Sequence, residues 1–180
     1  MKKIIIAISF VLIIFSSNIL AQSTLNLQGG VQFPSGDFSD VAGTGYGGSA
    51  TFEYKLPLLP ISLTGMIGYY HWGEKEDIEG VDYSYNSIPF MVGGRYYMSS
   101  LIIKPYFGAE LGINVFSSDV ETPRLKIENT DTKFSIAPMF GIKFGIGILI
   151  DLDVNIKYNV ITTDPSTNNF GVNAGVSFGF

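Results

Sequence analysis

Charged residues in the strand-like segments of this 180-residue sequence always occupy the polar alternate positions. These segments have a period of two, which is typical of a β-strand because successive side chains leave opposite faces. Carboxylates and cationic groups gathered in a confined space must pair, since an unpaired buried charge is costly. We therefore expect an ion-pair network along the inner face of a closed sheet. Its candidate members are Glu53, Arg95, Lys104, Glu110, Lys143, Asp153 and Lys157.

Other residues that could carry chemistry are few. The sequence has no cysteine, which excludes disulfides, thiolate metal sites and a cysteine nucleophile. His71 is the only histidine, and its position predicts an outward-facing rim residue beside Trp72. The glycine-rich stretch 43–48 precedes neither a helix nor a lysine, so it is not a phosphate-binding loop. We expect no catalytic residues, no metal and no cofactor.

Eight alternating segments can be recognised as strands. The connections between them are long, short, long, short, long, short and long, which is typical of an up-and-down barrel with short turns at one end. A fold with 133–147 and 151–160 paired across a three-residue turn places Lys143 opposite Asp153. Pro89, Pro105 and Pro138 interrupt strands, so bulges or open ladder positions are expected there. The expected strands are 24–33, 45–55, 61–72, 86–98, 101–116, 133–147, 151–160 and 169–180.

The two faces of these strands indicate which side of the barrel is apolar. One face is almost wholly aliphatic and aromatic, and the other holds the charged and amide side chains with many glycines. A soluble barrel would place the apolar set inside. An eight-stranded barrel with a narrow polar interior and an apolar exterior must be surrounded by lipid. The predicted fold is therefore all-β, an eight-stranded antiparallel transmembrane β-barrel.

Residues 1–21 have the pattern of a secretory signal peptide, with a basic start and a twelve-residue apolar run from Ile4 to Phe15. Residues 22–180 then form a single barrel domain. The formal net charge of −5 argues against nucleic acid as a partner. The long connections 34–44, 73–85, 117–132 and 161–168 are strongly acidic, which indicates a solvated surface. A Ca²⁺ or Mg²⁺ contact shared with lipopolysaccharide phosphates is the alternative, but no calcium-loop motif is present.

The signal peptide, the eight alternating segments and the ending 175–180 together resemble the small outer-membrane barrels around the OmpA transmembrane domain and the OmpX-type proteins. The resemblance implies a Gram-negative outer membrane, with both termini in the periplasm. It also implies that Phe178 and Phe180 belong to a signal for the barrel assembly machinery. Outer-membrane lipids and lipopolysaccharide are then the expected surroundings of a monomer. The sequence lacks the peptidoglycan-binding domain of OmpA, so cell-wall anchoring is not carried over.

The function expected from these patterns is non-enzymatic, a structural or surface-interaction role through acidic outer loops. One alternative is a narrow small-solute channel gated by the lumenal charges. Another is an adhesin or ligand receptor that acts through residues 73–85 and 117–132. A remote alternative is a lipid A-modifying enzyme that uses His71, although no matching serine motif accompanies it.

Overall fold

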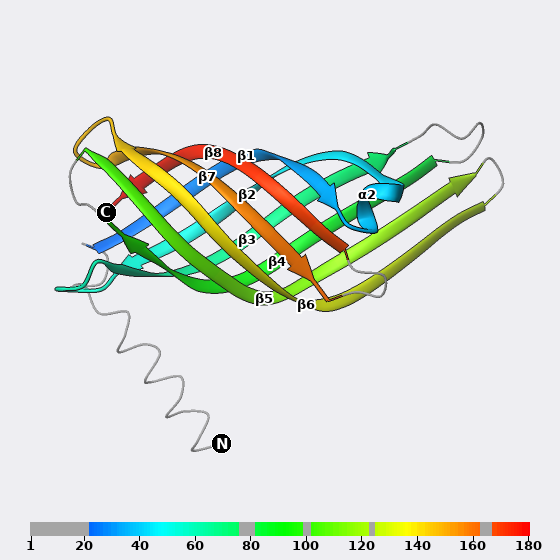
Figure 1. The fold of residues 1–180 in the computed structure, drawn as a ribbon, viewed down its shortest axis with the longest axis horizontal. Coiled ribbons are helices and arrows are strands. Elements are labelled where there is room, and N and C mark those ends of the chain that lie inside the picture. The colour runs from blue at the N-terminus through cyan, green and yellow to red at the C-terminus, as the bar shows by residue number, and fades with distance from the viewer. Residues whose placement is uncertain (1–21, 76–81, 99–101, 123–124, 163–166) are drawn as a thin grey trace, which may run out of the picture.

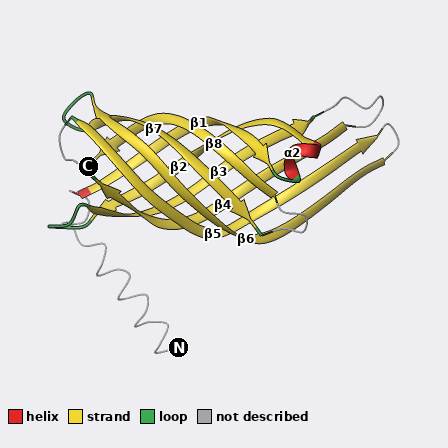
Figure 2. Ribbon diagram, viewed as in Figure 1, coloured by secondary structure: helices red, strands yellow, loops and turns green. Residues whose placement is uncertain are grey.

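A computed structural model describes residues 22–75, 82–98, 102–122, 125–162 and 167–180. The expected signal peptide and its cleavage site lie outside these residues. The described chain forms one closed antiparallel barrel in which each strand pairs with its sequence neighbours and the first pairs with the last. Figures 1 and 2 show the strands coiling around a single axis, with one short helix at one end. The predicted eight-stranded up-and-down barrel is confirmed.

The strands follow one another without a crossover. In chain order they are β1 Ser23–Ser35, β2 Ala42–Lys55, β3 Ile61–Glu74, β4 Asp82–Tyr97, β5 Ile103–Thr122, β6 Leu125–Gly145, β7 Ile150–Ile161 and β8 Thr167–Gly179. A four-residue helix, α2 Phe38–Val41, lies between β1 and β2. None of the described helical residues forms a helix long and apolar enough to cross a bilayer. The end with the β2–β3, β4–β5 and β6–β7 turns is called the short-turn end below, and the opposite end is the long-loop end.

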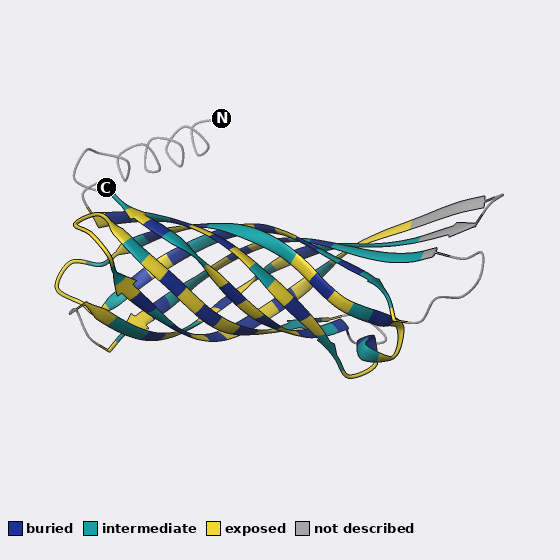
Figure 3. Cartoon of the chain, turned by 90° about the horizontal axis from the view of Figure 1, so that it is seen from above, coloured by how far each residue is buried: buried dark blue, intermediate teal, exposed yellow. Residues whose placement is uncertain are grey.

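Burial alternates along the strands, as the alternating dark-blue and yellow bands in the middle of the barrel in Figure 3 show. On β7, Asp153 and Asn155 are 0% and 2% exposed, whereas their neighbours Val154 and Ile156 are 44% and 42% exposed. The polar side chains therefore point to the axis and the apolar ones point outward. A water-soluble protein rarely exposes so continuous an apolar surface. This arrangement agrees with the sidedness predicted from the sequence.

Three strands extend four or more residues past a predicted end. β4 begins at Asp82, β5 continues to Thr122 and β6 begins at Leu125, so most of the expected 117–132 loop is a paired hairpin. The register runs without a break from Val115 opposite Thr132 to Thr122 opposite Leu125. Backbone pairing beyond the barrel needs no apolar face, and the alternation used for prediction is therefore weak there. The expected loop residues Glu76, Asp77, Glu79 and Asp164 lie outside the described residues.

The three strand prolines do not shift the register. The ladder between β3 and β4 is open beside Pro89, and the ladder between β6 and β7 is open beside Pro138. Pro105 lies near the start of β5, where its carbonyl accepts a hydrogen bond from the Met98 N–H at 2.9 Å. The expectation of bulges or open ladder positions is therefore confirmed at Pro89 and Pro138, whereas Pro105 pairs with Ile142 in an unbroken register. The one register irregularity among the described pairs falls between Ala42 and Gly45.

A cation on the outer face should be strongly destabilising at mid-depth. Phe140 lies at the centre of the outward row of β6 and is 44% exposed. Phe140→Arg should lower the unfolding free energy in lipid vesicles by about 2–4 kcal/mol more than Phe140→Ala does, because only the arginine places a charge in hydrocarbon. Urea-dependent unfolding of both variants measures this difference. Equal losses for the two variants would show that the outer face does not contact lipid.

Candidate functional site

Arg95 is the centre of a group of charged side chains inside the barrel. Its Nη1 lies 3.3 Å from Glu53 Oε2 and 3.3 Å from Asp153 Oδ2, and its Nη2 lies 3.9 Å from Glu110 Oε1. These residues come from strands β4, β2, β7 and β5, so the contacts cross the lumen. The guanidinium presents several donors in a fixed plane, which allows one side chain to contact three carboxylates.

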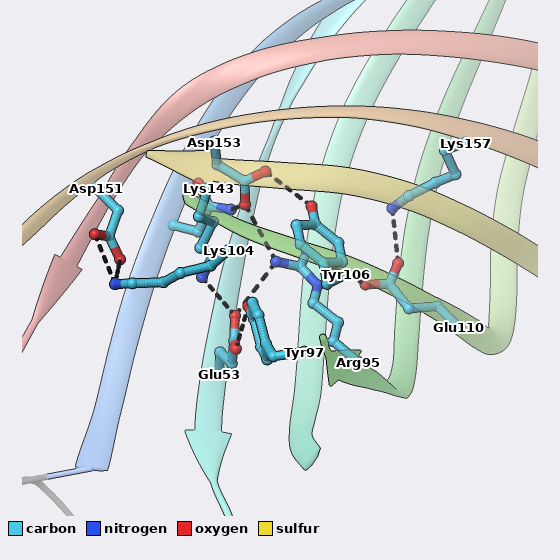
Figure 4. A network of polar contacts seen from close by, with 11 residues as sticks. Glu53, Arg95, Tyr97, Lys104, Tyr106, Glu110, Lys143, Asp151, Asp153 and Lys157 are labelled. Atoms are coloured by element: carbon cyan, nitrogen blue, oxygen red, sulfur yellow. Dashed lines mark hydrogen bonds and ion pairs between the residues drawn. The ribbon is translucent and has the colours of Figure 1, made fainter. Parts of the chain in front are cut away.

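Two lysines complete this group. Lys143 Nζ donates to Glu53 Oε2 at 2.8 Å, and Lys157 Nζ donates to Glu110 Oε2 at 2.7 Å. Figure 4 shows the resulting chain of contacts across the interior. Three cations face three carboxylates, so the group is formally neutral, and each of its residues is buried. The lumenal charge network is defined here as Glu53, Arg95, Glu110, Lys143, Asp153 and Lys157.

Neutral side chains donate further hydrogen bonds to two of these carboxylates, Glu53 and Asp153. The Tyr97 hydroxyl donates to Glu53 Oε1 at 2.6 Å, and the Tyr106 hydroxyl donates to Asp153 Oδ1 at 2.8 Å. Asn26 Nδ2 donates to Asp153 Oδ2 at 2.6 Å. The Arg95 guanidinium also lies over the Tyr106 ring, 4.9 Å from its centroid, which is a cation–π distance. The sequence analysis missed both tyrosines, although each shares its alternate position with a predicted inward charge.

Lys104 was predicted with the others but lies apart from the network. Its Nζ contacts Asp151 Oδ1 at 2.9 Å, and the two side chains are 30% and 21% exposed. Lys143 does face Asp153 in the register, as expected, yet its ion pair is with Glu53. The geometry thus brings six of the seven predicted residues together and places Lys104 at the mouth.

The network separates two cavities of very different size. At the short-turn end lies an open vestibule of about 650 Å³, lined in part by Lys55, Lys104 and Asp151. On the other side of the network a cavity of about 10 Å³ lies beside Trp72 and Ser135. The smaller volume is about that of one water-sized probe. The section of the lumen that Arg95 crosses is therefore occupied by side chains.

Apolar side chains also fill the lumen beyond the network. Met66 and Met91 are buried against Ala137, and Met139 is buried as well. Methionine adapts to irregular spaces, which suits a narrow interior. The sequence analysis assigned the inner face to polar residues and glycine, so it missed these methionines.

An aromatic cluster closes the long-loop end of the lumen. Helix α2 places Phe38 against the rings of Trp72, Tyr85 and Phe116, with centroid distances of 5.6, 5.3 and 5.8 Å in edge-to-face geometry. Tyr70 packs next to Trp72 at 6.3 Å. Edge-to-face pairs stabilise beyond their buried area. The aromatic cluster is defined as Phe38, Tyr70, Trp72, Tyr85 and Phe116. Phe38 comes from the connection between β1 and β2, so the alternation along the strands could not predict its place in the cluster.

His71 lies on the outward face near the long-loop end, as predicted. The Asn86 Oδ1 atom accepts from the Tyr69 hydroxyl at 2.7 Å, while Asn86 Nδ2 donates to Asp119 Oδ2 at 3.3 Å. The 2.9 Å contact of His71 Nδ1 with the same Oδ1 therefore requires the proton on Nδ1. Tyr46 packs beside the imidazole with ring centroids 5.6 Å apart. Among the described residues no hydroxyl group hydrogen-bonds to His71, so a serine–histidine pair is not formed in this part of the chain.

The two terminal phenylalanines face outward at the short-turn end. Phe178 and Phe180 are both exposed, and the Phe180 N–H donates to the Ser23 carbonyl at 3.0 Å. Pairing of β8 with β1 closes the barrel at this point. Their role as an assembly signal stays a prediction.

Comparisons with known proteins agree with this geometry. A family model described as "Outer membrane protein beta-barrel domain" matches residues 7–178. No curated protein sequence gives a significant match. Among solved structures, Neisserial surface protein A (NspA) is 16% identical and has a TM-score of 0.67, with 88% of this chain and 97% of that chain covered.

Two further structures show the same fold. The attachment invasion locus protein Ail of Yersinia pestis, solved in complex with the heparin analogue sucrose octasulfate, is 13% identical with a TM-score of 0.57, covering 87% of this chain and 99% of that one. The outer membrane enzyme PagL is 14% identical with a TM-score of 0.53, covering 88% and 99%. At these identities the likeness concerns the fold alone.

Loss of the central cation should destabilise the barrel. Arg95→Met removes the positive charge between three buried carboxylates, and breaking a buried ion pair from one side costs about 3–5 kcal/mol. Lys104→Met is the matched control, because it removes a partly exposed lysine whose ion pair is worth about 0–1 kcal/mol. Unfolding free energies in vesicles measure both changes. Similar losses for the two variants would contradict a central role of Arg95.

Proposed function

The chain belongs to the outer membrane protein beta-barrel domain family, and we propose that it is a closed, non-conducting and non-enzymatic barrel that presents its long-loop end to the environment. It is an integral outer-membrane protein. The observation that carries the proposal is the side-chain filling of the lumen, by the lumenal charge network and by the aromatic cluster. Function then resides in the surface of the barrel and in its extended strands.

The ion pairs support a stable plug because every network charge has an opposite partner. Arg95 contacts carboxylates from three different strands, so its displacement would break several contacts at once. The hydroxyls of Tyr97 and Tyr106 satisfy the remaining carboxylate oxygens of Glu53 and Asp153. Arg95 Nε and Glu110 Oε1 have no hydrogen-bond partner among the described residues, but every charge of the network has an opposite charge within 4 Å. Several contacts per charge favour a plug over a gate. A gated small-solute channel is the alternative that the same residues leave open.

We place the short-turn end in the periplasm, with residues 22 and 180 on that side. The two ends of the described chain meet at this end of the barrel, because the Phe180 N–H donates to the Ser23 carbonyl at 3.0 Å. Outer-membrane barrels have short periplasmic turns and longer external loops. The acidic side chains Asp37, Asp40, Glu74 and Asp131 then lie toward the external medium. A monomer in lipopolysaccharide, inserted by the barrel assembly machinery through the segment with Phe178 and Phe180, is the arrangement that we propose.

The strands of the long-loop end form the proposed interaction surface. The β5–β6 hairpin continues in register past the barrel, from Val115 opposite Thr132 to Thr122 opposite Leu125. Strand β4 accompanies it as far as Asp82 opposite Glu121. A paired sheet keeps its shape outside the membrane, and this favours a surface role for these strands over a passive loop.

Conductance measurements test the proposed closure. Purified protein in planar bilayers should show no steps, or only very small ones, because Arg95 and its partners occupy the lumen. The double variant Arg95→Ala/Tyr106→Ala removes the two side chains that lie over each other at its centre, and it should increase the conductance. Large and steady steps in the unmodified protein would overturn the proposal in favour of a channel.

We propose that His71, with its neighbours Tyr46, Tyr69 and Asn86, has a packing role at the rim of the barrel. Its Nδ1 is hydrogen-bonded to Asn86 Oδ1, and within the described residues no nucleophile is hydrogen-bonded to the ring. His71→Ala should therefore leave the lipid A mass spectrum of producing cells identical to that of cells with the unmodified protein. Cells without the protein are the control. A lipid A species that depends on both the protein and His71 would show an enzymatic activity.

A further inference from the structure

Among the described residues of the short-turn end, apolar side chains at or beside the turns are exposed to an unusual degree. Leu58 at the β2–β3 turn is 103% exposed, and Ile148 at the β6–β7 turn is 101% exposed. Ile102, beside the β4–β5 turn, is 73% exposed. Residues 56–60 and 146–150 contain no charged residue. Leucine and isoleucine at turn tips in water would gain nothing from this exposure, since the transfer of apolar surface out of water is favourable.

The backbone at Leu58 gives an independent reason to look for a role. Its φ is 65°, a left-handed conformation that non-glycine residues seldom adopt and in which glycine or asparagine is usual. The Leu59 N–H donates to the Leu56 carbonyl at 3.4 Å, so Leu58 follows Pro57 at the turn position that requires a positive φ. A leucine there costs conformational energy that glycine would not, and turn geometry alone does not explain the choice of leucine. The strain makes sense if the leucine side chain has a binding partner that glycine would lack.

The turns are continuous with the apolar outer face of the barrel. From Phe144 toward the short-turn end, the outward row of β6 continues through Ile146 to Ile148 in the turn. After the turn, Ile150 precedes the outward Leu152 of β7. The charges at this end face the axis instead, where Lys104 and Asp151 line the vestibule. The separation of apolar exterior from polar interior therefore extends beyond the strands into the turns.

The arrangement of the turns favours lipid over a protein partner. Because the strands close in sequence order, the β2–β3, β4–β5 and β6–β7 turns are spaced around the circumference, two strands apart. Figure 1 shows the β2–β3 and β6–β7 turns projecting on different sides of the same end. A ring around an open vestibule offers no single flat patch for a protein. A lipid leaflet surrounds a barrel on all sides, so it can contact apolar side chains that are spaced around the whole circumference.

The distance along the barrel axis from Phe134 to the β6–β7 turn indicates which layer of the membrane the turn tips reach. Ile148 follows the outward Phe134 by 14 positions. With a rise of about 3.3 Å per residue and a tilt of about 40°, this corresponds to roughly 35 Å along the axis, against an apolar band of about 25 Å. The turn tips thus reach the headgroup layer, where amphipathic segments bury apolar side chains about 5–10 Å deep at the acyl boundary.

We propose that the β2–β3 and β6–β7 turns, together with Ile102 beside the β4–β5 connection, are interfacial anchors, which insert Leu58, Ile102 and Ile148 into the lipid leaflet at the short-turn end and so fix the depth of the barrel. The occupant of this apolar surface is phospholipid, contacted at the boundary between headgroups and acyl chains. The vestibule inside the ring stays aqueous. This inference concerns the membrane contact alone and does not depend on whether the lumen conducts.

Spin labels can test the anchoring directly, because the sequence has no cysteine to remove. Single variants Leu58→Cys and Ile148→Cys would be labelled in vesicles of one phosphatidylcholine, and their accessibility to oxygen and to a water-soluble nickel complex compared. Phe144→Cys is the lipid-facing reference. Lys55→Cys, in the vestibule lining, and Thr130→Cys, exposed on the hairpin, are the aqueous references. Heat-modifiable migration on gels checks that each variant is folded.

Labels at positions 58 and 148 should be more accessible to oxygen than to the nickel complex, and closer to the label at 144 than to those at 55 and 130. If they match the aqueous references while position 144 still reports lipid, the anchoring is wrong and the barrel remains a membrane protein. If position 144 also reports water, the membrane assignment itself fails. The two failures are therefore distinguishable.

Discussion

A charged side chain in this barrel must face the lumen, and in the lumen it must be neutralised. Closure pairs the strand backbones all round, so the outer face needs no polar group and can be wholly apolar. The interior of eight strands is too narrow for hydrated ions. In the lumenal charge network, three cations and three carboxylates from five strands neutralise one another. Each of them depends on partners that only the closed barrel brings near.

Large inward side chains and glycines share the narrow interior. The Tyr106 ring lies across the backbone of Gly141, where a Cβ atom would collide with it. This lets the tyrosine donate to Asp153 and lie under Arg95 at the same time. Toward the long-loop end, the methionines and then the aromatic cluster continue the filling. At the short-turn end the vestibule remains open, and Lys104 in its lining pairs with Asp151 while the buried Lys143 pairs with Glu53.

The alternation in the sequence was sufficient to predict the strands, the sidedness and the inward charges, because a period of two assigns every residue to a face. It also implied that Tyr97 and Tyr106 face inward, a conclusion obscured by assigning aromatics to the rims. Which inward side chains form ion pairs or hydrogen bonds with one another could not be predicted. Asn26 and Asp153 are 127 positions apart, and their contact depends on the stagger of strands around the barrel. The extension of β5 and β6 beyond the barrel and the insertion of Phe38 into the lumen do not follow from the apolar–polar alternation, so neither could be predicted from the sequence.

The central claim is that Arg95 lies inside a closed lumen in contact with Asp153 and Glu53. The most direct measurement is a solid-state NMR recoupling experiment in lipid bilayers, between labelled guanidinium nitrogens and labelled carboxyl carbons. Strong dephasing is predicted, consistent with the 3.3 Å separation of Arg95 Nη1 from Asp153 Oδ2, and it should disappear in Asp153→Asn/Glu53→Gln. An Arg95 signal without carboxylate contacts, and in exchange with water, would contradict the account.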